Sequence, residues 1–183
     1  MKKLLGILVL LLCGNVAAYS NDRDDRLNQL FEQLKKSNNA SIALEIEMKI
    51  WNIWSTHPTQ GKLTQSLAKG SNFMSKVELE TAYNIFSTII DSAPDWAEGW
   101  NKRATVLYLT GRYQESLEDI DEVLKHESRH FGALSGQGLV QTALENYEKA
   151  IKSYEAVQKI YPSIKSAEVM IPQLKKLIKD NAI

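Results

Sequence analysis

The feature that most constrains the fold of this chain is an internal repeat. The segments Ala97–His130 and Phe131–Ile164 lie end to end, are each 34 residues long and align without a gap. A fixed period of between about 20 and 50 residues is typical of solenoids and other repeat arrays. The repeat therefore predicts a scaffold for binding. The aligned pairs are Tyr113 with Tyr147, Leu117 with Ile151, Val123 with Val157, and Leu124 with Gln158.

Prolines extend this repeat toward the N-terminus. Pro58, Pro94 and Pro162 lie 36 and then 68 residues apart, and 68 is twice the period of 34. Before each proline, hydrophobic residues recur at helical spacing in two successive segments, which predicts a pair of helices. The predicted organisation is a helical hairpin at 27–60, three repeat units at 63–96, 97–130 and 131–164, and a capping helix at 165–183.

The units resemble the tetratricopeptide repeat (TPR), which carries W-x2-L-G-x2-Y, then A-x3-F, then P. The third unit has Trp100 at the tryptophan position, Gly111 at the turn and Tyr113 at the start of its second helix. Small secreted bacterial members of the family are similar in the runs 100–104 and 129–136. The second and fourth units carry the other half of the motif, as Ala82-x3-Phe86 followed by Pro94 and Ala150-x3-Tyr154 followed by Pro162.

The resemblance implies the fold and a place for the function. It implies an all-α fold, a right-handed α-solenoid of TPR-type helix hairpins with a C-terminal capping helix. It also implies that the first helix of each unit lines a concave groove, which takes a peptide or a helix of a partner protein. The groove positions carry few charges, so a clamp for a terminal carboxylate is not predicted. The predicted groove residues are Leu67, Met74, Asn101, Thr105, Tyr108, Leu109, Ser135, Leu139 and Thr142.

The first residues are typical of a secretory signal peptide. Met1–Lys3 is positively charged, Leu4–Leu12 is apolar, and Val16–Ala18 matches a small-residue cleavage site. We expect cleavage after Ala18, a flexible leader at 19–26, no membrane span in the mature chain, and location in the bacterial periplasm or outside the cell. Lipidation of Cys13 is the alternative, but Leu12 stands where lipoprotein signals have a small residue.

Composition argues against several function classes. The chain has 22 basic and 22 acidic side chains, and cleavage would remove Lys2 and Lys3, so a counterion-driven attraction to nucleic acid is not expected. The predicted mature chain has no cysteine nucleophile, no phosphate-binding glycine loop and no G-x-S-x-G motif. We therefore expect no enzyme activity, no cofactor and a protein or peptide partner. The alternative is a structural or self-associating subunit of an envelope assembly complex.

Two histidines allow a second interpretation. His126 and His130 are four residues apart, a spacing that can hold a metal ion on a continuous helix. They fall where a helix is predicted to end, and no H-E-x-x-H pattern accompanies them. The prediction is of ordinary turn histidines and no metal site.

Two tryptophans also have two interpretations. Trp51 and Trp54 are three residues apart and share a helix face, which would suit either an exposed patch for a partner or a core contact. Aromatic stripes at helical spacing are more often core. The prediction is a core contact with the unit at 63–96.

Local signals place the ends of several helices. Gly111 is expected to end a helix with a positive φ, and Asn146 to do the same in the next unit. Ser75-x-x-Glu78 matches a capping box at a helix start. Pro172 is expected to kink or interrupt the capping helix.

Overall fold

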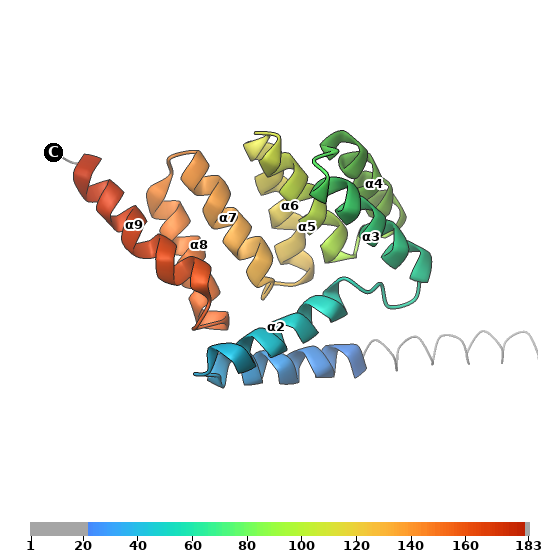
Figure 1. Ribbon diagram of the computed structural model, residues 1–183, viewed down its shortest axis with the longest axis horizontal. Coiled ribbons are helices and arrows are strands. Elements are labelled where there is room, and N and C mark those ends of the chain that lie inside the picture. The colour runs from blue at the N-terminus through green and yellow to red at the C-terminus, as the bar shows by residue number, and fades with distance from the viewer. Residues whose placement is uncertain (1–21, 182–183) are drawn as a thin grey trace, which may run out of the picture.

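The computed structural model describes residues 22–181, and every regular element in that range is an α-helix. An N-terminal helix of residues 22–36 comes first and pairs with α2 (Ala40–Trp54). Figure 1 shows the later helices standing side by side above this first pair. They are α3 (Gly61–Ser75), α4 (Leu79–Ser92), α5 (Ala97–Leu109), α6 (Tyr113–His126), α7 (Phe131–Ala143), α8 (Tyr147–Ile160) and α9 (Lys165–Asn181).

Helices α3 to α9 form a solenoid. The pairs α3–α4, α5–α6 and α7–α8 are antiparallel hairpins, and each hairpin packs against the next. The first helices of successive hairpins also touch, since α3 contacts α5, α5 contacts α7 and α7 contacts α9. These first helices therefore lie on the inner side of the curved stack, and the all-α solenoid predicted from the repeat is confirmed.

The cores of the units form where small and large side chains meet. Ala82 and Ala150 are fully buried, and Tyr154 is fully buried against Gly138, where an added Cβ would lie 2.6 Å from the tyrosine Cζ. Each unit thus packs its two helices closely and buries its apolar face against a neighbour.

Most of the predicted helix ends differ from the observed ones. Gly111 has a φ of 75° and follows α5, as predicted. In the next unit the positive φ belongs to Glu145, while Asn146 precedes α8 with a φ of −83°. Ser75 is the last residue of α3 and caps no helix start. Backbone pairing in these turns, rather than the side-chain motifs, sets the ends.

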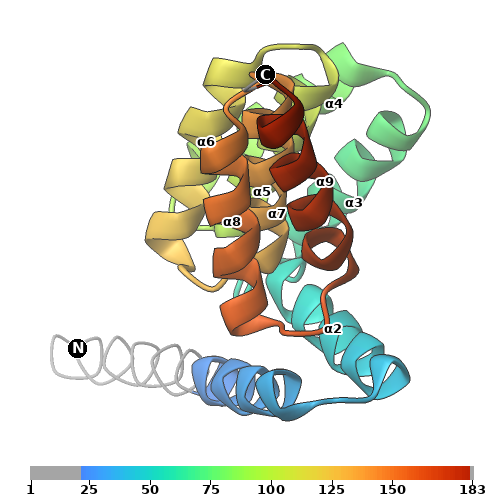
Figure 2. The ribbon, with the colours of Figure 1, turned by 90° about the vertical axis from the view of Figure 1, so that its left-hand side faces the viewer.

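The N-terminal hairpin does not continue the stack. Its buried residues pack against Phe131 and Leu134 of α7 and against Val157 and Tyr161 at the end of α8. Figures 1 and 2 show the two helices of the hairpin lying along one edge of the stack, below the ends of the later helices. Trp54 is buried, as the core interpretation predicted, but the two tryptophan rings pack against His130 and Phe131 rather than in the core of the unit at 63–96, so the predicted partner unit is wrong.

Three hydrogen bonds hold the hairpin along this edge, one from the turn at the end of each of the three units. Trp96 donates from Nε1 to the carbonyl of Trp54 at 2.9 Å, and Arg129 donates from Nη1 to Asn28 Oδ1 at 2.7 Å. The third runs from the Tyr161 hydroxyl to Glu47 Oε2 at 3.1 Å. One hairpin thus bridges three successive turns.

The ends of the chain also depart from prediction. The signal peptide at 1–18 lies outside the described residues, but residues 22–26 belong to the N-terminal helix, so the predicted leader at 19–26 is helical in its described part. Helix α9 runs without interruption through Pro172, where a kink or break was expected. Its buried Ala167 and Leu174 pack on the core of the last unit, so it covers the end of the solenoid.

Candidate functional site

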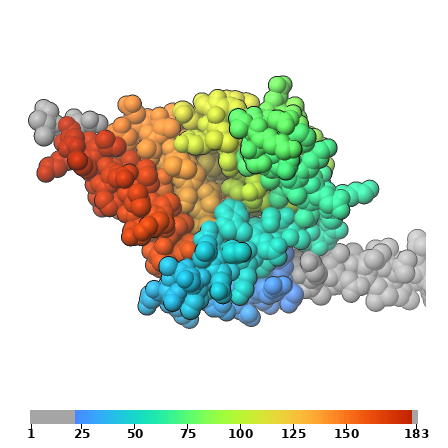
Figure 3. Space-filling model, in the orientation of Figure 1, coloured from blue at the N-terminus to red at the C-terminus, as the bar shows by residue number. Residues whose placement is uncertain are grey.

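Helices α5 and α7 bring four of the predicted groove residues together. Asn101, Thr105 and Tyr108 of α5 and Leu139 of α7 line one cavity of about 70 Å3, which opens between these helices on the inner side of the stack. Figure 3 shows the hollow on this side, bordered below by α2 and laterally by α3 and α7. The cavity lining carries no charged side chain.

The other predicted residues lie elsewhere. Leu67 is buried in the core between α3 and α4, so it is not free to line a groove, and Met74 is half-buried against the same core, outside the cavity. Leu109 is exposed at the end of α5, outside the cavity. The Thr142 hydroxyl donates to the carbonyl of Gly138 within the same helix, α7.

A second, larger cleft lies between α2, the start of α7 and the start of α9. It has a volume of about 510 Å3, and it includes the predicted Ser135, whose hydroxyl lies 3.3 Å from that of Ser166. Its α2 wall includes Leu44, Glu47 and Trp51. Leu44 and Glu47 were missed from the sequence, whereas Trp51 was considered for a partner surface and assigned to the core. The sequence did carry a signal for this wall, because α2 has apolar residues on more than one side and cannot bury all of them. Leu44 accordingly remains 54% exposed.

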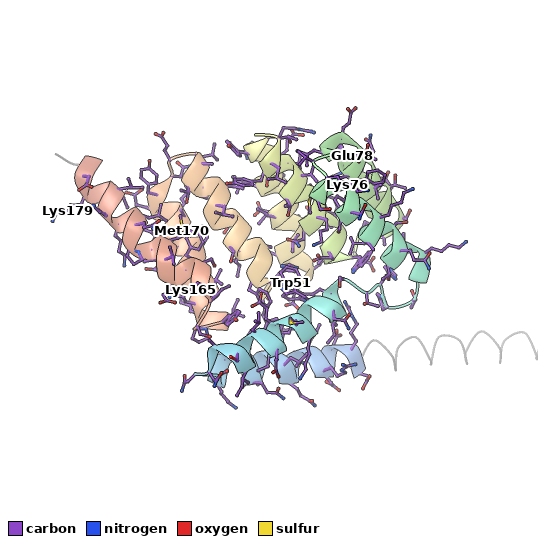
Figure 4. All side chains as sticks on the ribbon, viewed as in Figure 1. Trp51, Lys76, Glu78, Lys165, Met170 and Lys179 are labelled. Carbon is purple, nitrogen blue, oxygen red and sulfur yellow. The ribbon has the colours of Figure 1, made fainter. Side chains whose placement is uncertain are left out.

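Trp51 lies against Gly132, which lines both cavities. Figure 4 shows Trp51 between α2 and the lower end of α7. Its ring lies edge-on to the rings of Trp54, His130 and Phe131, with centroid distances of 5.3–5.4 Å. The Lys102 ammonium lies 5.6 Å from the centroid of the Trp51 ring. The tryptophan thus fixes α2 against the floor of the groove.

A buried polar cluster lies beneath this contact. The Glu98 carboxylate, 1% exposed, accepts from Asn101 Nδ2 at 3.0 Å and lies 3.2 Å from His130 Nε2 and 3.1 Å from Lys102 Nζ. Burial alone would raise the pKa of Glu98, but the hydrogen bond with His130 and the charge of Lys102 outweigh it, and the pKa lies below its ordinary value. Glu98 is therefore ionised at neutral pH.

This cluster fixes the orientation of its neighbours. His130 Nδ1 accepts from the backbone N–H of Ala133, so the hydrogen of the neutral ring is on Nε2, facing Glu98. The His130 ring stacks on the Trp54 ring, with 3.9 Å between the ring centroids. His130 thus caps α7 and joins it to α5 and the hairpin.

Both ring nitrogens of His130 therefore have partners within the protein. Among residues 22–181 no group of three or more His, Cys, Asp or Glu side chains is placed to hold a metal ion. No helix in the same range is long and apolar enough to span a bilayer.

The cationic side chains next to Asn101 in the sequence are also engaged. Lys102 pairs with Glu98, and Arg103 pairs with Asp119 through two hydrogen bonds of 2.8 and 2.7 Å. A clamp for a terminal carboxylate needs free cationic and amide donors. The donors near this cavity already bind carboxylates of the chain.

Comparison with known proteins finds a relative that aligns with most of the chain. No family model matches the chain. It is 34% identical over 166 residues to a TPR repeat-containing protein of Rhizobium etli, covering 88% of this chain and 79% of that protein.

Solved structures show the same fold at lower identity. The Sgt2 TPR domain from Aspergillus fumigatus has a TM-score of 0.64 and 17% identity, covering 67% of this chain and 83% of that one. The first TPR of Spaghetti, bound to the HSP90 peptide SRMEEVD, has a TM-score of 0.62 and 19% identity, covering 64% of this chain and 94% of that one.

Proposed function

Because this chain belongs to the tetratricopeptide repeat family, we propose that it is a protein-interaction module that binds a segment of a partner protein on the inner side of its solenoid. A related fold, the first TPR of Spaghetti, has been solved with a bound peptide, which supports this type of activity. The proposed site extends over α5 and α7, with α2 as its lower wall.

The observation that carries the proposal is the open cavity between α5 and α7. Asn101, Thr105 and Tyr108 combine polar groups with an apolar ring, and Leu139 is 41% exposed beside them. Ligand sites in proteins typically combine apolar lining with a few oriented polar groups. A segment lying here would contact α2 as well, because Trp51 and Leu44 border the neighbouring cleft.

The partner segment is proposed to differ from the acidic HSP90 peptide that Spaghetti binds. Lys102 and Arg103 are already paired with Glu98 and Asp119, so an acidic segment would have to break an existing ion pair to find a cation. A segment with few charges avoids this cost. Binding is therefore proposed to depend on shape and apolar contact.

A capture experiment with two matched leucine variants tests this function. Leu139 and Leu144 are 41% and 38% exposed, but only Leu139 lines the cavity. A partner is expected to be recovered from a periplasmic extract by the wild type and by Leu144→Glu, and to be lost with Leu139→Glu. Equal recovery by both variants would contradict groove binding, and circular dichroism checks that both remain folded.

The place of action is proposed to be the periplasm. The proposal rests on the positive start, the apolar run and the small-residue site of residues 1–18. A fusion of the whole chain to alkaline phosphatase, which is active only after export, is expected to be active. Fusion activity that persists after deletion of residues 1–18 would contradict the signal assignment.

A further inference from the structure

Two glycines of α7, one helical turn apart, face the groove with different neighbours. A Cβ added at Gly132 would lie 2.5 Å from Cη2 of Trp51, so the tryptophan ring fills the space beside this glycine. A Cβ added at Gly136 would meet only Ile120 Cδ1, at 3.7 Å. The chain thus fills one depression of α7 with its own aromatic side chain and leaves the next one open.

The open depression is part of the 70 Å3 cavity. We refer to this whole cavity as the Gly136 socket; its apolar lining includes Gly136, Leu139 and Val140 of α7, Tyr108 of α5 and Ile120 of α6. An apolar cavity of about 150 Å3 accommodates benzene. A socket of half that volume has room for an aliphatic side chain of about three or four carbons, and an aromatic ring is too large.

A polar side chain also lines the same cavity. Asn101 lines it and is 8% exposed. The ionised Glu98 carboxylate only accepts hydrogen bonds, so the amide must turn its Nδ2 toward Glu98, which leaves Oδ1 as the free acceptor. Among the described residues no hydrogen bond to Asn101 Oδ1 is found, and this oxygen is not one of the fully buried polar atoms that lack a partner, so it keeps some exposed surface. An accessible acceptor without a donor can take a hydrogen bond from a ligand.

We propose that the Gly136 socket holds one aliphatic side chain of the partner segment, a valine, leucine or isoleucine, and that Asn101 Oδ1 accepts a hydrogen bond from the backbone of that segment. This inference rests on the proposed function and specifies which kind of residue the partner segment inserts. The segment is uncharged around the anchoring residue, because the socket lining carries no charge and Lys102 is paired with Glu98.

The test begins with a displayed library of random peptides selected on the purified chain. The enriched peptides are expected to share one aliphatic position and to lack acidic residues beside it. Synthetic versions with amidated ends are then titrated into the wild type. Replacing the shared aliphatic residue by alanine is expected to weaken binding roughly tenfold or more, the range for lost methylene groups in an apolar pocket. This arm does not depend on the folding of any variant.

The second arm fills the socket from the protein side. Gly136→Leu is expected to abolish binding of the same peptides, whereas Gly61→Leu, at the open start of α3 where nothing lies within 4 Å of an added Cβ, is expected to keep it. Equal binding by Gly136→Leu and the wild type would overturn the socket and leave the groove proposal intact. Binding that survives Leu139→Glu would overturn both the socket and the groove proposal, and so would a library that yields no binder. Peptides that require an acidic end would overturn the proposal that the anchoring segment is uncharged.

Discussion

Alanine at Gly132 and alanine at Gly136 are expected to change stability in opposite directions. At position 132 the new Cβ would lie 2.5 Å and 2.9 Å from two carbons of the Trp51 ring, where about 3.5–4.0 Å is the ordinary carbon separation. The rings of Trp54, His130 and Phe131 lie edge-on to the Trp51 ring and resist its shift away from Gly132. Overpacking of this kind costs about 1–3 kcal/mol.

The helix propensity of alanine acts in the other direction. In a helix interior alanine is favoured over glycine by up to about 1 kcal/mol. Gly132→Ala is therefore expected to lower the free energy of unfolding by about 0–2 kcal/mol. At Gly136 the nearest atom is an ordinary 3.7 Å away, so Gly136→Ala is expected to raise it by up to about 1 kcal/mol. The difference of about 1–3 kcal/mol between the variants isolates the contact with Trp51.

Urea denaturation followed by circular dichroism and tryptophan fluorescence measures this difference. Gly132→Ala is also expected to shift the emission of the folded protein to longer wavelength, because Trp51 is displaced from its aromatic neighbours. Equal denaturation midpoints for the two variants would refute the docking of the hairpin through Trp51. A fluorescence shift in Gly136→Ala would do the same, since that position does not touch the ring.

Three further changes are expected to give separate results. The pKa of Glu98 is lowered in the folded chain, so the ionised Glu98 stabilises the fold fully above pH 4.5, and this stabilisation is lost as the pH falls below that value. The urea midpoints of the wild type and Glu98→Gln should therefore differ at neutral pH and converge in acid. Tyr154→Phe removes a buried hydroxyl that has no hydrogen-bond partner among the described residues, so thermal melts should show no loss and a gain of up to about 1 kcal/mol; a clear loss would reveal a partner. Gly111→Ala should cost about 1–2 kcal/mol in urea denaturation because φ is 75°, whereas Gly61→Ala, equally open but with an ordinary φ, should cost nothing.

The repeat pattern was sufficient to predict the solenoid because its contacts are between neighbours. A unit of 34 residues must bury its apolar face against the next unit, so period and hydrophobic spacing together imply the stack. The position of Gly111 could be predicted for a similar reason, since a positive φ at a helix end is a local requirement.

The N-terminal hairpin could not be placed in this way. Its hydrogen bonds join residues 42, 101 and 114 positions apart, and these separations follow no period. Apolar residues on several sides of α2 were consistent with packing against any neighbour. Only the geometry of the three turns shows that the hairpin lies along the edge of the stack and presents Leu44 and Trp51 beside the groove.

The residues of the candidate site could be predicted only in part, because repeat positions do not report contacts between distant parts of the chain. Asn101, Thr105, Tyr108 and Leu139 were found from repeat positions and line one cavity, whereas Leu67 occupies an equivalent position and is buried. Position within a repeat specifies which way a side chain faces. It does not specify whether a neighbouring unit covers that side chain.

The sequence by itself thus determined the family, the helical hairpins and their order, because these follow from local propensity and from contacts between adjacent units. The tertiary structure decided where the hairpin of residues 22–54 packs, that Glu98 holds Asn101, Lys102 and His130, and that the space beside Gly132 is filled while that beside Gly136 is open. These features depend on side chains from distant parts of the chain meeting in one place, and no periodic pattern encodes such a meeting.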